Sequence, residues 1–310
     1  MKIGFFGTPD LAARVLSDLG DRHEILFAVT APDRPAGRKL ELHSCPAKVE
    51  ALRRGVPVLQ PSSLKDPDAR KAILSRDADI FIVVAYGGLI PRDIFDHPPL
   101  KTINLHPSLL PRYRGAAPIQ WCLMHGERET GITVQVINER LDAGDIVVQE
   151  RIPLGPDMTA ADLYAIVISR GAELLGRAMT GLAAGTAERL PQDESLATYC
   201  GKIDRGVAMI DWGRGSADIH NQVRGLNPKP AAFSTFRGEN IKIWRTAIFG
   251  EDMPPGARHG ALAVYEKKRL IAGTGDGYIE ILSIQPANKK IIDGLSFING
   301  YRLTGDDRFE

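Results

Sequence analysis

Short apolar runs alternate with amphipathic stretches through the first hundred residues of the chain. The runs have the length and composition of β-strands, and they cover residues 3–6, 25–30, 57–60, 79–86 and 102–106. The stretches between the last three suit helices that begin at Asp66 and at Pro91. Strand–helix alternation predicts a parallel, doubly wound sheet with both faces covered. Such sheets bind ligands beyond the carboxyl ends of their strands, so polar residues at those ends are the first candidates for a site.

The pattern changes after residue 130. Residues 131–138 and 146–152 alternate as two antiparallel strands do, and the loop between them carries Asp142. A longer amphipathic helix follows, for which Thr159 is the expected N-cap, with Asp162 three residues later. These elements extend the sheet of the first half.

The last third of the chain predicts a helix at about 216–225 and then short strands separated by turn residues. The strands cover residues 233–236, 241–244, 261–265, 269–272 and 277–284. A helix with about five short strands suits a small barrel of OB type. The predicted fold is therefore α/β: a Rossmann-like parallel-sheet domain over 1–186, a polar linker over 187–203 and an OB-like β-barrel domain over 204–310.

Composition and charge are those of a soluble globular protein. The chain has 44% hydrophobic and 25% charged residues, and its 39 basic and 38 acidic residues leave a formal charge of +1. The longest apolar run, residues 80–90, is too short to span a bilayer. The start, MKIGFFGTPD, lacks the apolar stretch of a secretory signal. Three cysteines without CxxC spacing argue against disulfides and zinc, so we expect a cytoplasmic protein without a metal.

The first strand–helix turn lies where nucleotide cofactors often bind. It reads Gly4-Phe-Phe-Gly7-Thr-Pro-Asp10, in which Asp10 stands where the dinucleotide fingerprint needs a glycine. The grip on a pyrophosphate is incomplete, which disfavours a nicotinamide oxidoreductase. A tight turn with unusual dihedral angles explains Gly7 as well.

The strand at 102–106 carries the most informative polar pair. Asn104 and His106 are two residues apart, so their side chains project to the same face at the carboxyl end of the strand. An amide donor beside a group that titrates near neutral pH suits acyl transfer, in which an oxyanion forms and an amine loses a proton. Asp142 is the candidate to orient the imidazole. The alternative readings are a strand end with two satisfied polar residues and a polar hairpin turn at Asp142.

A basic stretch between residues 34 and 54 is the candidate surface for a phosphate backbone. It holds six basic residues against two acidic ones. Arg53 and Arg54 are equally explained as the solvated face of a helix. A non-catalytic RNA-binding module would need only this stretch and the barrel.

Several motifs together resemble the methionyl-tRNA formyltransferase family. They are GTPD at 7–10, PDRPAGR at 32–38, VVAYG at 83–87, NLHPSLLPRYRGAAPIQW at 104–121, ETG at 129–131, LDAGD at 141–145, LSIQPANKK at 282–290 and FINGYR at 297–302. NLHPSLLP followed by LDAGD is typical of folate-dependent formyltransferases in general, whereas PDRPAGR and the C-terminal motifs narrow the resemblance to the tRNA enzymes.

The resemblance implies transfer of a formyl group from 10-formyltetrahydrofolate to the methionine of initiator methionyl-tRNA. We expect a monomer without a metal or a membrane partner. Asn104, His106 and Asp142 fall on the family's catalytic positions. Eight residues are expected to line the folate pocket: Tyr86, Gly88, Leu89, Ile90, Ser108, Leu109, Leu110 and Pro111. Four are expected to contact the tRNA acceptor stem, namely Arg34, Arg38, Lys39 and Lys48, while the barrel grips the tRNA backbone.

The chain departs from the family pattern on the nucleic-acid side. After Arg38 it continues Lys39-Leu-Glu41-Leu-His43, which is less basic than the family's usual glycine and paired lysines. Lys229 stands where the family has an aromatic residue between two prolines. The alternative acceptor is therefore an amino-sugar nucleotide, used by a folate-dependent N-formyltransferase of the same fold.

Overall fold

The computed structural model describes residues 1–36, 41–250 and 258–310. These residues form two compact units. The first unit comprises Met1–Ala116, Glu129–Pro153 and Tyr164–Cys200. The second unit comprises Ala117–Arg128, Leu154–Leu163 and Gly201–Glu310. The second unit thus takes in two short stretches whose sequence lies between segments of the first.

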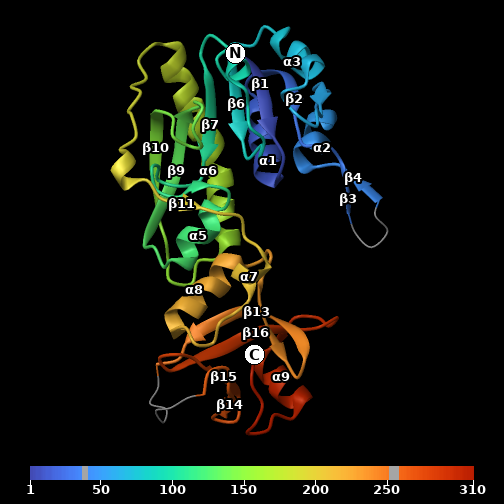
Figure 1. Ribbon diagram of the computed structural model, residues 1–310, viewed down its shortest axis with the longest axis vertical. Helices are drawn as coiled ribbons and strands as arrows, with labels where there is room; N and C mark the ends of the chain where they lie inside the picture. The colour runs from blue at the N-terminus through green and yellow to red at the C-terminus, as the bar shows by residue number, and fades with distance from the viewer. Residues whose placement is uncertain (37–40, 251–257) are drawn as a thin grey trace. The chain divides into compact units, whose positions relative to one another are not determined.

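A seven-stranded sheet organises the first unit (Figure 1). Strands β7, β6, β1, β2 and β5 are parallel in that order, and β9 and β10 continue the sheet antiparallel beyond β7. The strands are β1 Lys2–Gly7, β2 Glu24–Val29, β5 Val58–Leu59, β6 Ile80–Val84, β7 Thr102–His106, β9 Glu129–Val136 and β10 Ile146–Pro153. All seven were predicted from the apolar pattern, with ends within two residues of those observed.

Unbroken apolar runs explain why the middle of this sheet is parallel. A strand covered on both faces needs apolar side chains on both, and every residue of β6 is apolar and buried. The rings of Phe6, Phe27 and Phe81 pack in edge-on or tilted contacts, with centroids 5.4 to 6.1 Å apart. Burying each ring contributes about 1.5–3 kcal/mol. This aromatic cluster holds β1, β2 and β6 together.

Two helices of the first unit, α3 (Pro67–Leu74) and α6 (Ala160–Ala183), begin at capping side chains. Its other helices are α1 Asp10–Gly20, α2 Pro46–Arg53 and α4 Arg92–Phe95. The Asp66 carboxylate caps α3 by accepting hydrogen bonds from the amides of Asp68 and Ala69, at 2.8 and 3.4 Å. The predicted start at Asp66 is therefore confirmed, and α4 follows Pro91 directly.

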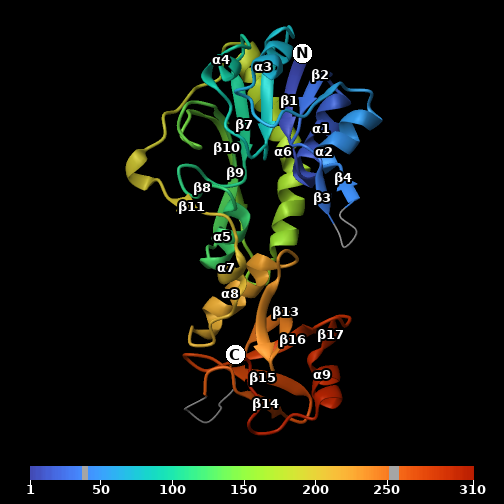
Figure 2. The same ribbon diagram turned by 45° about the vertical axis from the view of Figure 1, so that its right-hand side comes forward.

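The long helix α6 begins with the predicted reciprocal cap. The Thr159 amide donates to Asp162 Oδ2 at 2.9 Å, and the Asp162 amide donates to Thr159 Oγ1 at 3.3 Å. From Tyr164 onward α6 belongs to the first unit, and Figure 2 shows it running beside the strands. A side chain at Gly171 would lie 2.8 Å from a methyl group of Leu105, so this glycine lets the helix approach β7.

The polar segment after α6 is bound to the first unit as far as Cys200. Leu190 forms a bridge with Ile146, and a 3-10 turn follows at Glu194–Leu196. Strand β11 (Tyr199–Cys200) then pairs in parallel with β8 (Arg114–Gly115). Most of the segment predicted as a linker, 187–203, is thus hydrogen-bonded structure, while the domain limits themselves stay a prediction.

The second unit is built on an antiparallel sheet. Its order is β12-β13-β16-β15-β14, and β17 pairs with β16. Its elements are α5 Pro118–Met124, α7 Arg205–Ala208, α8 Ser216–Leu226, β12 Ala232–Phe236, β13 Glu239–Ile248, β14 Leu262–Tyr265, β15 Arg269–Gly273, β16 Tyr278–Pro286, β17 Ile292–Asp293 and α9 Gly294–Tyr301. All five predicted strands and the helix at 216–225 are confirmed.

The last residues of the chain close this sheet. Glu310 exchanges backbone hydrogen bonds with Thr235 of β12, at 3.0 and 3.1 Å. The Phe309 amide donates to Gly260 O and the Leu262 amide to Asp307 O, at 2.8 and 2.9 Å. Residues 307–310 therefore join the β12 edge to the β14 edge. The expected fold class, a Rossmann-like domain followed by a small antiparallel β domain, is confirmed. No helix among the described residues is long and apolar enough to cross a membrane.

Candidate active site

Asn104 and His106 lie at the carboxyl end of β7, between β6 and β9. The antiparallel pairing with β9 sets Asn104 opposite Gln135 and His106 opposite Thr133. His106 is 4% exposed, whereas Asn104 is partly accessible. The period of two along the strand, predicted from sequence, places both side chains on one face.

The loop between β9 and β10 brings Asp142 to the same place. Asp142 has a φ of +49°, in the left-handed region. Two residues later, a Cβ on Gly144 would lie 1.6 Å from Val136 O, so only glycine fits there. The Gly115 amide donates to Asp142 Oδ2 at 2.9 Å and fixes one carboxylate oxygen. The loop is a polar turn, and it also positions the Asp142 side chain.

The other oxygen of Asp142 faces both side chains of β7. Asn104 Nδ2 lies 3.4 Å from Asp142 Oδ1, and His106 Nδ1 lies 3.7 Å from the same atom. His106 Nε2 is 2.9 Å from Tyr113 O, and because a carbonyl only accepts, Nε2 carries hydrogen. A second proton on the ring therefore sits on Nδ1, toward the carboxylate. An amide, an imidazole and a carboxylate that are distant in sequence converge here.

Gln135 is a residue of this site that the sequence did not single out. Its side chain is buried, and its Nε2 donates to Asp142 Oδ1 at 3.1 Å. The available signal was a lone amide within the apolar strand Glu129–Val136, at the level of Asn104 in the neighbouring strand.

The residues expected at the folate pocket follow two adjacent strands. Tyr86 and Ile90 come after β6, and both pack on the hydrophobic core that contains Phe6, Phe27 and Phe81. Burial raises the pKa of the Tyr86 phenol, which therefore stays protonated near neutral pH. Gly88 is exposed, and Leu89 is 84% exposed, an unusual environment for leucine. β6 and β7 are paired neighbours, so this turn starts beside the end of β7.

The second expected folate segment follows β7 directly. Ser108 is fully buried, and its Oγ donates to Arg112 O at 2.7 Å. Leu110 is also buried and Leu109 is partly so. The Leu110 amide donates to Thr133 Oγ1 at 3.2 Å, ahead of a cis bond to Pro111. The segment 108–111 thus continues directly from the end of β7 at His106. Its role in binding folate stays a prediction.

The residues expected at the tRNA stem are only partly described. Arg34 is exposed in β3 (Arg34–Ala36), which pairs with β4 (Glu41–His43). Arg38 and Lys39 lie outside the described residues. Lys48 is half-buried, and its Nζ lies 2.6 Å from Asp33 Oδ2, so its charge is already paired within the protein.

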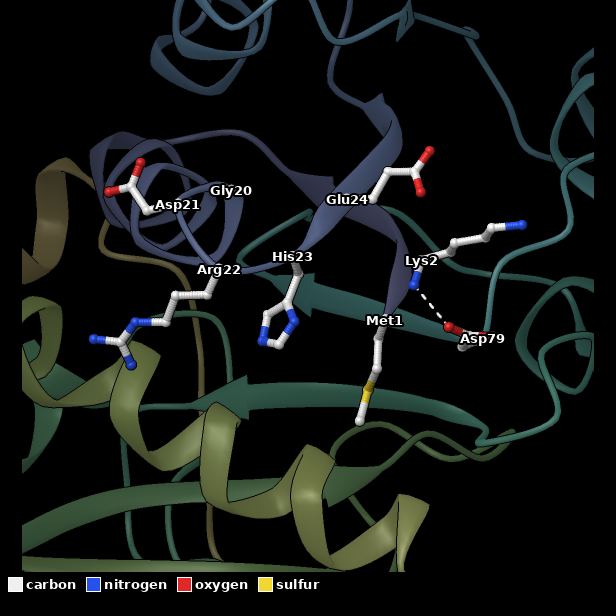
Figure 3. Close-up of a pocket in the computed structure, with 8 residues that line it drawn as sticks. All are labelled: Met1, Lys2, Gly20, Asp21, Arg22, His23, Glu24 and Asp79. Carbon is white, nitrogen blue, oxygen red and sulfur yellow. Dashed lines mark hydrogen bonds between the residues drawn. The ribbon is translucent and has the colours of Figure 1, made fainter.

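A shallow hollow lies at the opposite end of the sheet. Met1, Lys2 and Asp79 line it at the amino ends of β1 and β6, together with residues 20–24 (Figure 3). The Lys2 amide donates to Asp79 Oδ2 there at 2.7 Å. Acidic and basic side chains are mixed around it, which gives no basis for a ligand of one charge. Within the described part of the chain, no group of three or more His, Cys, Asp or Glu side chains could hold a metal ion.

Comparison with protein families gives two matches in chain order. Residues 1–179 match the formyl transferase family, and residues 202–302 match the formyl transferase C-terminal domain. The chain is 39% identical to methionyl-tRNA formyltransferase of Carboxydothermus hydrogenoformans, with 100% of both chains covered. It is 37% identical to methionyl-tRNA formyltransferase of Bacillus subtilis, over 99% of this chain and 96% of that one.

Solved structures with a similar fold are more distant in sequence. An N-formyltransferase from Helicobacter canadensis has a TM-score of 0.68 and 20% identity, over 92% of this chain and 99% of that one. The sugar 3N-formyl transferase WlaRD has a TM-score of 0.67 and 20% identity, over 94% and 99%. HypX from Aquifex aeolicus has a TM-score of 0.64 and 20% identity, and this chain spans 47% of its length. At such identities the likeness concerns the fold alone.

Proposed function

Because the chain belongs to the methionyl-tRNA formyltransferase family, we propose that it transfers a formyl group from 10-formyltetrahydrofolate to the amino group of methionine on initiator methionyl-tRNA. Relatives of that name match it along its whole length at 37–39% identity. The observation that carries the chemistry is the convergence of Asn104, His106 and Asp142 at the end of β7.

The three side chains suit the two charge changes of the reaction. The methionine amine attacks the formyl carbon, and the formyl oxygen takes up negative charge in the tetrahedral intermediate. Asn104 Nδ2 and a protonated His106 Nδ1 are the donors for that oxygen. Their distances to Asp142, 3.4 and 3.7 Å, are longer than normal hydrogen bonds, so each can turn to a substrate atom.

Asp142 serves the proton lost by the amine. Its carboxylate faces His106 Nδ1, the ring atom that would carry a second proton, and helps to orient the imidazole. It also offers an acceptor for the amine proton, directly or through a water molecule. Collapse of the intermediate breaks the bond between carbon and the folate N10, which takes up a proton.

The comparisons favour tRNA over an amino-sugar nucleotide as acceptor. Relatives near 38% identity over the full chain carry the tRNA enzyme's name, whereas sugar N-formyltransferases match at 20%. A nicotinamide oxidoreductase has no support beyond the strand–helix turn at Gly7.

The decisive experiment offers two acceptors to the purified protein with 10-formyltetrahydrofolate. One is charged initiator methionyl-tRNA, and the other is a nucleotide-linked amino sugar. We expect N-formylmethionine on the tRNA and no formylated sugar. Formylation of the sugar alone would overturn the proposed acceptor, and formate release without any acceptor would indicate a hydrolase.

We further propose a cytoplasmic monomer. Initiator tRNA is charged and used in that compartment, and a single chain supplies all three converging side chains. Light scattering at micromolar concentration is expected to give the mass of one chain, and a doubled mass would contradict it.

A further inference from the structure

Beyond the three converging side chains, a series of hydrogen-bonded polar side chains leads away from Asp142. Its first member is Gln135, 2% exposed, which donates from Nε2 to Asp142 Oδ1 at 3.1 Å. Its Oε1 accepts two hydrogen bonds at 3.1 Å, from the Gly144 amide and from Gln192 Nε2. The same side chain thus contacts the Asp142 carboxylate and the loop that carries it.

Gln192 is the second member and comes from the segment after α6. Besides Gln135, its Nε2 lies 2.9 Å from Asp142 O and 2.7 Å from Gly144 O. Its Oε1 accepts from Arg114 Nε at 3.1 Å and from Arg114 Nη2 at 2.8 Å. One amide therefore connects both backbone carbonyls of the Asp142 loop to a guanidinium.

Arg114 anchors the far end. It is fully buried, and its Nη1 and Nη2 donate to the two carboxylate oxygens of Glu194 at 3.1 and 2.9 Å. Nη1 also lies 3.2 Å from the Tyr199 hydroxyl. A buried arginine with paired contacts holds a fixed orientation. Removing it would leave the half-buried oxygen of Gln192 without its donor, and would release Glu194 and Tyr199, which are exposed.

Arg114 determines the orientation of the two glutamine side-chain amides. A guanidinium has only donors, so Gln192 must turn its oxygen toward it and its nitrogen away. That nitrogen then needs an acceptor, which makes Gln135 present its oxygen. The nitrogen of Gln135 is left for Asp142. The Gly144 amide and the two loop carbonyls agree with the same directions.

We propose that Gln135 and Gln192 are positioning residues for Asp142, with Arg114 setting the direction of their hydrogen bonds. Through them Asp142 Oδ1 keeps a fixed donor, and its carboxylate faces Asn104 and His106 in one orientation. This inference rests on the proposed formyl transfer. It assigns a catalytic consequence to groups that touch neither substrate.

Two variants separate positioning from packing. Gln192→Glu keeps the volume and the acceptor for Arg114 but loses the donor. The Gln135 nitrogen can then turn from Asp142 toward the new carboxylate. Gln135→Leu removes the donor to Asp142 directly. Gln222→Leu is the matched control: Gln222 is 4% exposed in the second unit, and its Nε2 donates to two backbone carbonyls at 2.8 and 3.0 Å.

Formyl transfer is measured as kcat and as KM for both substrates, alongside thermal unfolding. Both site variants are expected to lower kcat by about 10- to 100-fold, because a misplaced group costs that much, with each KM within about twofold of the parent. Gln222→Leu should lower thermal stability and leave kcat within about twofold of the parent.

Failure of this inference is distinct from failure of the proposed function. A parent protein without formyl transfer would overturn the function itself. An active parent whose site variants fold and keep kcat within about twofold would overturn the positioning role. So would an equal loss of kcat in Gln222→Leu, since that is what packing alone predicts. If Gln135→Leu does not fold, Gln192→Glu alone tests the positioning role. Gln192 is half-buried and this variant keeps the contact with Arg114, so we expect it to fold.

Discussion

Asp142 reaches the other two side chains because its loop adopts a conformation that few sequences allow. Its φ of +49° lies in a region where aspartate and asparagine are more common than most residues. Gly144 leaves room for the carbonyl of Val136, and the Gly115 amide holds one carboxylate oxygen. The carboxylate is therefore placed by backbone geometry and by hydrogen bonds together.

Loss of His106 is expected to abolish most turnover while leaving tRNA binding intact. His106→Ala removes a donor to the forming oxyanion, and Asn104→Ala removes the other, so each should lower kcat by about 10²–10³-fold. Steady-state kinetics and a tRNA binding titration check this. His97→Ala changes an exposed histidine of the same unit and serves as the control.

A near-normal kcat in His106→Ala would remove the imidazole from the mechanism. A loss of tRNA affinity equal to the loss of rate would instead make the residue part of the tRNA site.

Arg34 and Lys48 are expected to differ in their effect on tRNA affinity. Arg34 is exposed, so Arg34→Ala should raise KM for tRNA and reduce the salt slope of binding by about one. Lys48 already pairs with Asp33, so Lys48→Ala should change both quantities less. Binding measured at several salt concentrations checks the order. Equal effects would show that Lys48 leaves Asp33 when tRNA binds.

For single residues, the sequence predicts the direction of a side chain well and the groups that it contacts poorly. Asn104 and His106 were predicted as a pair because a strand has a period of two. Asp142 was one of two aspartates around a glycine, and its identity as the partner needed the family resemblance. Gln135 and Arg114 gave no pattern, because a single buried polar residue in a strand looks the same whatever it contacts.

The elements themselves begin and end where local chemistry requires. Asp66 caps α3 and the Thr159–Asp162 pair caps α6, and all three residues were identified from the sequence. Such ends are predictable because the bonds that form them span two or three residues.

Removal of the α3 cap is expected to cost about 1 kcal/mol of unfolding free energy. Asp66→Ala leaves the amides of Asp68 and Ala69 without their side-chain acceptor. Chemical denaturation of this variant and of Lys65→Ala, an exposed neighbour, gives the comparison. Equal stability of the two variants would show that water replaces the cap without loss.

Elements held by distant partners could not be predicted. Strands β8 and β11 have two residues each and pair across a separation of more than eighty positions, so neither carries a periodic pattern. Helix α5 has five buried residues in seven, and an all-round apolar segment of that length does not distinguish a helix from a strand.

For the molecule as a whole, an ion pair links β12 to the closing segment of the second unit. Arg237 Nε and Nη2 donate to the two oxygens of Asp307 at 2.8 and 2.7 Å, and Thr304 adds its amide. These contacts, that of Arg237 first, lower the pKa of Asp307 from 3.8 to about 2. A carboxyl whose pKa is lowered by folding stabilises the fold above its unfolded pKa.

Stability of the second unit should therefore fall as pH drops from 3.8 to about 2. Asp307→Asn is expected to be less stable than the parent at neutral pH, and the difference should shrink across this window. Unfolding followed as a function of pH checks it, with the exposed neighbour Asp306→Asn as the control. A difference that does not vary with pH would mean that packing, and not charge, holds Asp307.

The division into two units was less accessible to prediction than the fold of each. Strand patterns separated a parallel sheet from an antiparallel one near residue 204. They could not show that Ala117–Arg128 belongs with the later residues, because that association depends on packing between α5 and α8. Gly225 permits this contact: a Cβ there would lie 2.7 Å from Met124 Cγ.

Because of this packing, α5 depends on a helix that is synthesised later. A ribosome makes α5 well before α8, and domains tend to fold as they emerge. While β9, β10 and α6 are still being translated, Ile119, Leu123 and Met124 have no partner from α8, although all three are buried in the finished protein. We therefore expect the nascent chain to expose the apolar segment Pro118–Met124 for this interval, when a chaperone at the tunnel exit could bind it.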